Sequence, residues 1–227
     1  MQKKNRLFSF IFLIIFLSQL YAEYINNNTL RVLSKPFIVI ILMAWIYSAT
    51  KLPKPFYKNI FAGLICAWLG DMLLMIHEGK SSFFLFGLIA FLLCHIFYIR
   101  AFLLDYQLKK VQKNPFLLWA FIVFTAFCAG LFIYLQPHLG SMQYPVLIYA
   151  VIISIMAIMA VSRFGRVNLF SFEIIFYGAM LFLFSDSMLA YNKFVETLPN
   201  AGLIIMASYM IAQYLIVLGS IKRRIAV

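Results

Sequence analysis

Apolar residues dominate the chain in long, nearly uninterrupted runs that short polar stretches separate. Most runs come close to the roughly 20 residues that an α-helix needs to cross a bilayer. The predicted spans are Leu7–Tyr21, Val32–Ala49, Tyr57–Ile76, Ser82–Leu104, Pro115–Leu135, Tyr144–Ser162, Leu169–Tyr191 and Ala201–Ser220. The pattern predicts an all-α, polytopic membrane protein of about eight transmembrane helices.

The composition supports this prediction. Of the 227 residues, 65% are hydrophobic and only 11% are charged, whereas a soluble domain has about 25% charged residues. Lipid must therefore be the main solvent, and hydrocarbon admits only helices or closed barrels, in which every backbone group finds a partner. Barrel strands would alternate apolar and polar residues, but the runs here are continuous. Because the connections are short, we expect residues 1–227 to form one integral membrane domain.

The basic residues predict the orientation of the chain. If the N-terminus lies inside, all 19 lysines and arginines fall at inner helix ends except Arg31, Lys35, Lys80 and Lys193. Cytoplasmic loops carry an excess of Lys and Arg, so both termini are predicted to be cytoplasmic, in the inner membrane of a bacterium. The net charge of +12 is therefore a topology signal, and no nucleic-acid partner is expected.

The first apolar run has an alternative interpretation. Lys3 and Arg6 precede it, and it ends in Leu20-Tyr21-Ala22, as a secretory signal peptide would. Leu20 is a poor residue for the third position before a cleavage site. We therefore expect this run to be a retained transmembrane helix.

Several kinds of chemistry have no motif in this chain. There is no HExxH or clustered His set, no GxSxG, and no GxGxxG or P-loop. The three cysteines, Cys66, Cys94 and Cys128, lie in apolar runs without CxxC spacing, so we interpret them as small buried side chains. Neither a metal nor an organic cofactor is expected, which leaves carboxylate acid–base chemistry.

Ionisable groups inside membrane spans are costly and mark functional sites by default, and five of those in the predicted spans are not explained as basic residues of the inner helix ends. They are Lys35, Asp71, His95, Glu173 and Asp186. The predicted topology puts Lys35, Asp71 and Asp186 at about 6–9 Å below the outer boundary, at a rise of about 1.5 Å per residue. Three such groups at one depth on three helices predict a single polar site in the outer half of the bilayer.

Further polar residues lie on the same or neighbouring spans and are candidates to line this site. Tyr149 has a similar depth, Ser185 is adjacent to Asp186, and His95 and Tyr98 share a helix face at i, i+3 spacing. Gln213 lies near the middle of the last span.

Some of these residues have structural alternatives. Lys35 can extend to the outer headgroups with no role in a site, and His95 can brace two helices through a hydrogen bond. Glu173 is expected to pair with Arg163 or Arg166 near the inner end. Packing alone does not explain two carboxyl groups, Asp71 and Asp186, at matched depth in the apolar phase.

Short blocks of sequence around these residues are similar to those of a known family. The blocks are Ser34-Lys35-Pro36, Gly70-Asp71, Ala90–Tyr98, Tyr144–Tyr149, Gly178–Asp186 with Leu189-Ala190, and Tyr209–Gln213. In this order they resemble the YhhN-like lysoplasmalogenases, membrane enzymes that cleave the vinyl ether bond of lysoplasmalogens. The resemblance implies that Asp71 and Asp186 form the active-site pair.

The resemblance also implies a substrate and a mechanism. The substrate is a single-chain ether phospholipid with a choline or ethanolamine head group, surrounded by membrane lipids. One carboxyl group protonates the alkenyl carbon, and the other stabilises the oxocarbenium-like ion and orients water, as paired carboxylates do in glycosidases. Which aspartate has which role is left open. Lys35 is expected to bind the phosphate or to keep an aspartate ionised, while Tyr149, His95, Tyr98, Ser185 and Gln213 line the pocket.

Two other classes of function are compatible with the same residues. Intramembrane carboxylates also serve proton-coupled transporters and lipid flippases, although the chain shows no clear inverted repeat or pair of broken helices. A catalytically inactive structural protein would use the aspartates only for stability. The oligomeric state is not predicted by the sequence.

Overall fold

The computed structural model describes residues 2–75, 81–108 and 114–225. In these ranges eight helices are long and apolar enough to cross a membrane. They are α1 (Gln2–Tyr24), α2 (Asn28–Thr50), α3 (Pro55–Met75), α4 (Ser81–Leu108), α5 (Pro115–Leu135), α6 (Gln143–Ser162), α7 (Leu169–Phe194) and α8 (Ala201–Ile221). The predicted all-α, polytopic membrane fold is confirmed.

Each predicted run lies within one helix, apart from Ile76, which is outside the described residues. Lys80, Lys109, Lys110 and Lys113, which contributed to the predicted orientation, are also outside them. Two short 3₁₀ helices, η1 (Gln136–His138) and η2 (Gly140–Met142), connect α5 to α6.

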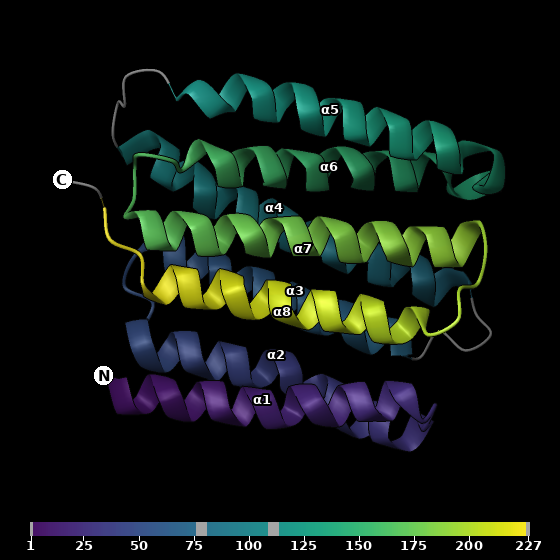
Figure 1. The fold of residues 1–227 in the computed structure, drawn as a ribbon, viewed down its shortest axis with the longest axis horizontal. Helices are drawn as coiled ribbons and strands as arrows, with labels where there is room; N and C mark the ends of the chain where they lie inside the picture. The colour runs from purple at the N-terminus through teal and green to yellow at the C-terminus, as the bar shows by residue number, and fades with distance from the viewer. Residues whose placement is uncertain (1, 76–80, 109–113, 226–227) are drawn as a thin grey trace.

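Consecutive helices pack as antiparallel hairpins, α1 with α2, α3 with α4, α5 with α6, and α7 with α8. Further contacts join α4 to α6, α2 to α3 and α6 to α7, and α8 also touches α1 and α2. Figure 1 shows that both termini lie at one end of the bundle. We call this the terminal end, and its location in the cytoplasm remains a prediction.

Local sequence signals set the beginnings and ends of several helices. The Asn27 side chain accepts a hydrogen bond from the Leu30 N–H at the start of α2, and Asn114 does the same for Phe116 in α5. Asn is a favoured N-cap residue for this reason. Pro55 begins α3, where its missing N–H costs nothing.

Glycines allow the helices that carry the candidate site residues to approach closely. A Cβ atom at Gly70 of α3 would lie 2.7 Å from the Phe91 ring of α4. A Cβ atom at Gly178 of α7 would lie 3.0 Å from the backbone oxygen of Ala212 in α8. These small-residue contacts fix α3 against α4 and α7 against α8, as is common in membrane bundles, and so position Asp71 and Asp186.

A buried cluster of ionised side chains closes the terminal end. Asp105 of α4 accepts a hydrogen bond from Nε of Arg163 at 2.8 Å and another from Nε of Arg223 at 2.7 Å. Burial lowers the pKa of the Arg163 guanidinium, an effect that the Asp105 carboxylate opposes. Asp105 thereby ties the C-terminal segment and the end of α6 to α4.

The prediction that Glu173 pairs with Arg163 or Arg166 was wrong. Arg163 pairs with Asp105, and Arg166 donates to the backbone oxygens of Ser162 and Tyr106. Glu173 is exposed on α7, and within the described ranges it makes no ion pair with either arginine. Asp105 was not among the predicted site residues, because it follows the last residue of the predicted span.

Candidate active site

A cavity of about 500 Å³ opens between α1, α2, α3, α4, α7 and α8. Asp71 and Asp186 both line it, together with Lys35. Asp71 lies four residues before the end of α3, and Asp186 lies eight residues before the end of α7. Both helices run away from the terminal end, so the cavity is in the opposite half of the bundle. The three residues expected at one depth therefore meet in one cavity.

Asp71 contacts a cation and a neutral hydroxyl group. Its Oδ1 atom lies 3.6 Å from Nζ of Lys35, and its Oδ2 atom accepts a 2.7 Å hydrogen bond from the hydroxyl of Tyr209. The Asp71 side chain is only 3% exposed, and that of Lys35 is 14% exposed. Lys35 therefore points into the protein instead of extending to the headgroups.

Asp186 has a different environment. Its Oδ2 atom accepts a short hydrogen bond from the hydroxyl of Tyr149 and lies 3.1 Å from Nε2 of His95. His95 Nε2 also lies 2.9 Å from the Tyr149 hydroxyl. The three side chains form one compact group that joins α4, α6 and α7.

The tautomer of His95 follows from its surroundings. His95 is fully buried, and its Nδ1 atom has no hydrogen-bond partner among the described residues. A proton on Nδ1 would be a buried donor without an acceptor, which is costly. The neutral ring with its proton on Nε2 avoids this cost and lets His95 donate toward Asp186.

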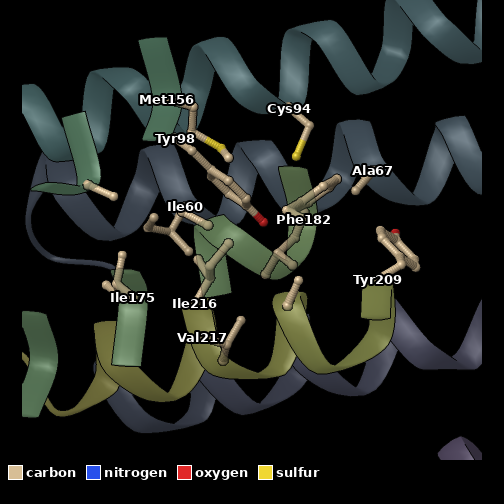
Figure 2. Close-up of a cluster of buried hydrophobic side chains, with 14 of the residues drawn as sticks. Ile60, Ala67, Cys94, Tyr98, Met156, Ile175, Phe182, Tyr209, Ile216 and Val217 are labelled. Carbon is tan, nitrogen blue, oxygen red and sulfur yellow. The ribbon is translucent and has the colours of Figure 1, made fainter. Parts of the chain in front are cut away.

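Aromatic rings that pack edge to face separate the two aspartate groups. Phe182 lies 5.5 Å from Tyr209 and 4.7 Å from His95, measured between ring centroids, and Phe91 lies 5.7 Å from Tyr209. Figure 2 shows Phe182 in the middle of the buried cluster, with Tyr209 on one side and Tyr98 on the other. This packing holds the partners of each carboxyl group in place while the carboxyl groups face the cavity.

The remaining predicted residues are distributed between the cavity and the core. Ser185 lines the cavity, but its hydroxyl donates to the backbone oxygen of Ile205 at 2.9 Å. The Tyr98 hydroxyl donates to Oε1 of Gln213 at 2.6 Å, and both side chains are fully buried. Four of the residues predicted to line the pocket are not among those that line this cavity, namely Tyr98, Gln213, Tyr149 and His95.

Two residues at the cavity were missed by the sequence analysis. Tyr209 is four residues before Gln213 on α8, and this i, i+4 spacing could have placed it on the same helix face. Glu23 lines the cavity from α1, which continues to Tyr24, beyond the predicted end at Tyr21. Its position after the apolar run hid its location in the bundle.

No set of three or more His, Cys, Asp or Glu side chains in the described part of the chain converges as metal ligands would. Cys66, Cys94 and Cys128 are free thiols. The polar groups at the cavity are carboxyl, ammonium, hydroxyl and amide groups.

The fold and the cavity define a class of protein, namely an integral membrane protein with two carboxyl groups at one intramembrane cavity. The particular family follows from comparison, because the YhhN family matches residues 30–220 of this chain. The chain belongs to the YhhN family, and the resemblance seen in the sequence is confirmed.

Curated relatives carry names that describe an activity. The chain is 31% identical to lysoplasmalogenase TMEM86B of Mus musculus over 159 residues, which are 70% of this chain and 62% of that relative. It is 30% identical to the Rattus norvegicus TMEM86B over 83% of this chain and 71% of the relative. It is also 30% identical to lysoplasmalogenase TMEM86A of Homo sapiens, over 76% of this chain and 69% of the relative. No solved structure matches the chain.

Proposed function

We propose that this protein is a lysoplasmalogenase, a membrane hydrolase that cleaves the vinyl ether bond of a single-chain alkenyl phospholipid. The observation that carries the proposal is the pair of carboxyl groups, Asp71 and Asp186, at one cavity with different partners. Membership of the YhhN family and the names of the relatives support the same activity.

The cavity has the size and the lining that this substrate needs. Its volume of about 500 Å³ is within the range of small-molecule sites. Leu74, Phe84, Phe91 and Leu189 give it apolar walls that fit the start of an alkenyl chain. The Lys35 ammonium adds a positive charge that suits the phosphate of the head group.

We assign different roles to the two aspartates on the basis of their neighbours. Asp71 lies 3.6 Å from the Lys35 ammonium, and an adjacent cation favours the ionised carboxylate. Asp186 is bonded instead to the neutral Tyr149 hydroxyl and to His95, neither of which carries a fixed positive charge. Asp186 is therefore the general acid, and Asp71 is the anion that stabilises the cation and orients water.

The reaction follows from these assignments. Asp186 gives its proton to the alkenyl carbon that does not carry the oxygen, and the adjacent carbon becomes part of an oxocarbenium-like ion. The Asp71 carboxylate stabilises this charge and takes a proton from the attacking water, so that a hemiacetal forms. The hemiacetal then collapses: Asp71 gives its proton to the leaving glycerol oxygen, the Asp186 carboxylate takes the proton of the hemiacetal hydroxyl, and a fatty aldehyde and a glycerophospho-base leave with both aspartates in their starting states. One water molecule is consumed in total.

Three further residues act through the aspartates. Tyr149 and His95 both contact Oδ2 of Asp186 and leave Oδ1 for the proton. Tyr209 holds Oδ2 of Asp71 on the other side of the aromatic cluster. They are positioning residues, since a carboxyl group that donates a proton to carbon must be held in a narrow range of directions.

The predicted topology places this reaction in the outer half of the cytoplasmic membrane of a bacterium. A single-chain lipid would enter from the surrounding bilayer, with its head group toward the outer boundary. The partners in this reaction are the lysolipid substrate and the surrounding membrane lipids.

Detection of fatty aldehyde tests the proposal against its main rival. Detergent-purified protein should release aldehyde from an alkenyl lysophospholipid, but not from an acyl lysophospholipid of equal chain length. A transporter or flippase would return the alkenyl lipid unchanged and would move it across the membrane of a proteoliposome. Transport without any aldehyde would therefore replace the enzyme proposal.

A further inference from the structure

Glu23 is a partly buried carboxylate at the cavity that the proposed reaction does not use. It lies at the end of α1, lines the same cavity as Lys35 and Asp71, and its side chain is 10% exposed. The match to the YhhN family begins at residue 30, so Glu23 lies outside it. Burying a charged carboxylate in a membrane protein is costly, which marks Glu23 as a functional residue.

A chain of hydrogen bonds fixes the direction of the Glu23 carboxylate. Its Oε1 atom accepts from the amide of Gln19 at 2.9 Å, and the Gln19 carbonyl accepts from the hydroxyl of Ser34 at 2.6 Å. Gln19 is fully buried, and Ser34 directly precedes Lys35 on α2. The carboxylate and the Lys35 ammonium are therefore held by connected elements.

Arg31 forms an ion pair with Glu23 from outside the cavity. Its Nε atom lies 3.0 Å from Oε2 of Glu23, while its Nη2 atom donates to Asn26 and to the backbone oxygen of Glu23. Arg31 is 26% exposed and is not found among the residues that line the cavity. Gly202 leaves room for the carboxylate, since a Cβ atom there would lie 2.7 Å from Oε2.

We propose that Glu23 is a head-group subsite that binds the primary ammonium of an ethanolamine-type lysolipid. This inference rests on the proposed function, which places the vinyl ether at the aspartates and the phosphate at Lys35. Glu23 and Lys35 then offer opposite charges at one cavity, as a zwitterionic head group requires. A hydrogen bond from an ammonium group to a carboxylate is stronger than one from an uncharged donor.

The lining favours a primary over a quaternary ammonium. Quaternary ammonium groups are bound by the free faces of aromatic rings. At this cavity the Phe84 ring already faces the Lys193 ammonium at 5.1 Å, and Phe91 and Tyr209 pack against each other. Thr197 also lines the cavity, and a hydroxyl group can accept a hydrogen bond from a primary ammonium but not from a quaternary one.

The test compares kcat/KM for alkenyl lysolipids with ethanolamine, choline and uncharged glycerol head groups. The unmodified protein should prefer ethanolamine over glycerol by about tenfold, the value of one charge-assisted hydrogen bond. Glu23→Gln should reduce this preference to roughly twofold or less, mainly through KM. Gly202→Ala should reduce it as well, because its added methyl group displaces the carboxylate while the charge is kept.

A matched control is Glu173→Gln, the same change at an exposed carboxylate that lies in a groove with Trp119 and Tyr177. This variant should keep the head-group preference of the parent. Equal loss on all three substrates in Glu23→Gln, or an unchanged preference in both cavity variants, would contradict the subsite alone. Absence of aldehyde from every substrate would instead contradict the proposed function, and the subsite with it.

Discussion

The ammonium group of Lys35 on α2 lies 3.6 Å from Oδ1 of Asp71 on α3. Asp186 at the same cavity is held by the hydroxyl of Tyr149 and the imidazole of His95 instead. This asymmetry gives the two carboxyl groups different charges in the proposed reaction, although both come from apolar helices. It leads to predictions that distinguish the two groups.

Lys35→Gln should lower kcat/KM by about 10–100-fold, because it removes a charge-assisted contact from Asp71 and a partner from the lipid phosphate. Lys35→Arg keeps the charge and should retain more activity. Kinetics of aldehyde release with purified protein measure both. Full activity in Lys35→Gln would show that the ion pair has no role in turnover.

Tyr149→Phe should lower kcat by roughly 10–100-fold with little change in KM, because Asp186 loses the donor that orients it. Tyr98→Phe is a suitable control, since Tyr98 is also a buried tyrosine but donates to Gln213, away from the cavity lining. Steady-state kinetics of the two variants, giving kcat and KM for each, test this prediction. A larger effect on kcat from Tyr98→Phe than from Tyr149→Phe would contradict the positioning role.

Tyr209→Phe should likewise reduce kcat, because Oδ2 of Asp71 loses its 2.7 Å hydrogen bond. Its effect should not add fully to that of Asp71→Asn, since both changes act on the same carboxyl group. A double-mutant cycle of aldehyde release measures this coupling. Complete additivity would mean that Tyr209 acts independently of Asp71.

Asp105→Asn should lower the free energy of unfolding by about 3–5 kcal/mol, because it leaves Arg163 and Arg223 buried without their carboxylate. The midpoint of thermal unfolding in detergent measures the change. The folded fraction should keep the kcat of the parent, since Asp105 lies at the terminal end, away from the cavity. Loss of kcat without loss of stability would contradict this structural role of Asp105.

The fold could be predicted from the sequence because the hydropathy of a segment directly indicates whether it can cross the membrane. The ends of helices were less accessible to prediction, since polar residues continue a helix outside the hydrocarbon. Thus α1 begins at Gln2 and α4 continues to Leu108, whereas the predicted spans began at Leu7 and ended at Leu104. The residues hidden by this effect include Glu23 and Asp105.

The site could be predicted in part. Depth along a helix places Lys35, Asp71 and Asp186 together, because helix geometry relates sequence position to height in the membrane. It does not say which side chains meet at that height. Tyr209 was missed for this reason, since a tyrosine in an apolar helix is chemically indistinguishable from a packing residue until its neighbours are known.

The central claim is that this protein hydrolyses a vinyl ether with Asp71 and Asp186. The most direct measurement is aldehyde release from an alkenyl lysophospholipid by the parent, Asp71→Asn, Asp186→Asn and the control Glu173→Gln, all purified and shown to be folded. We predict release by the parent and the control, and a loss of at least about 100-fold in each aspartate variant. Parental rates in either aspartate variant, or no aldehyde from the parent, would contradict the claim.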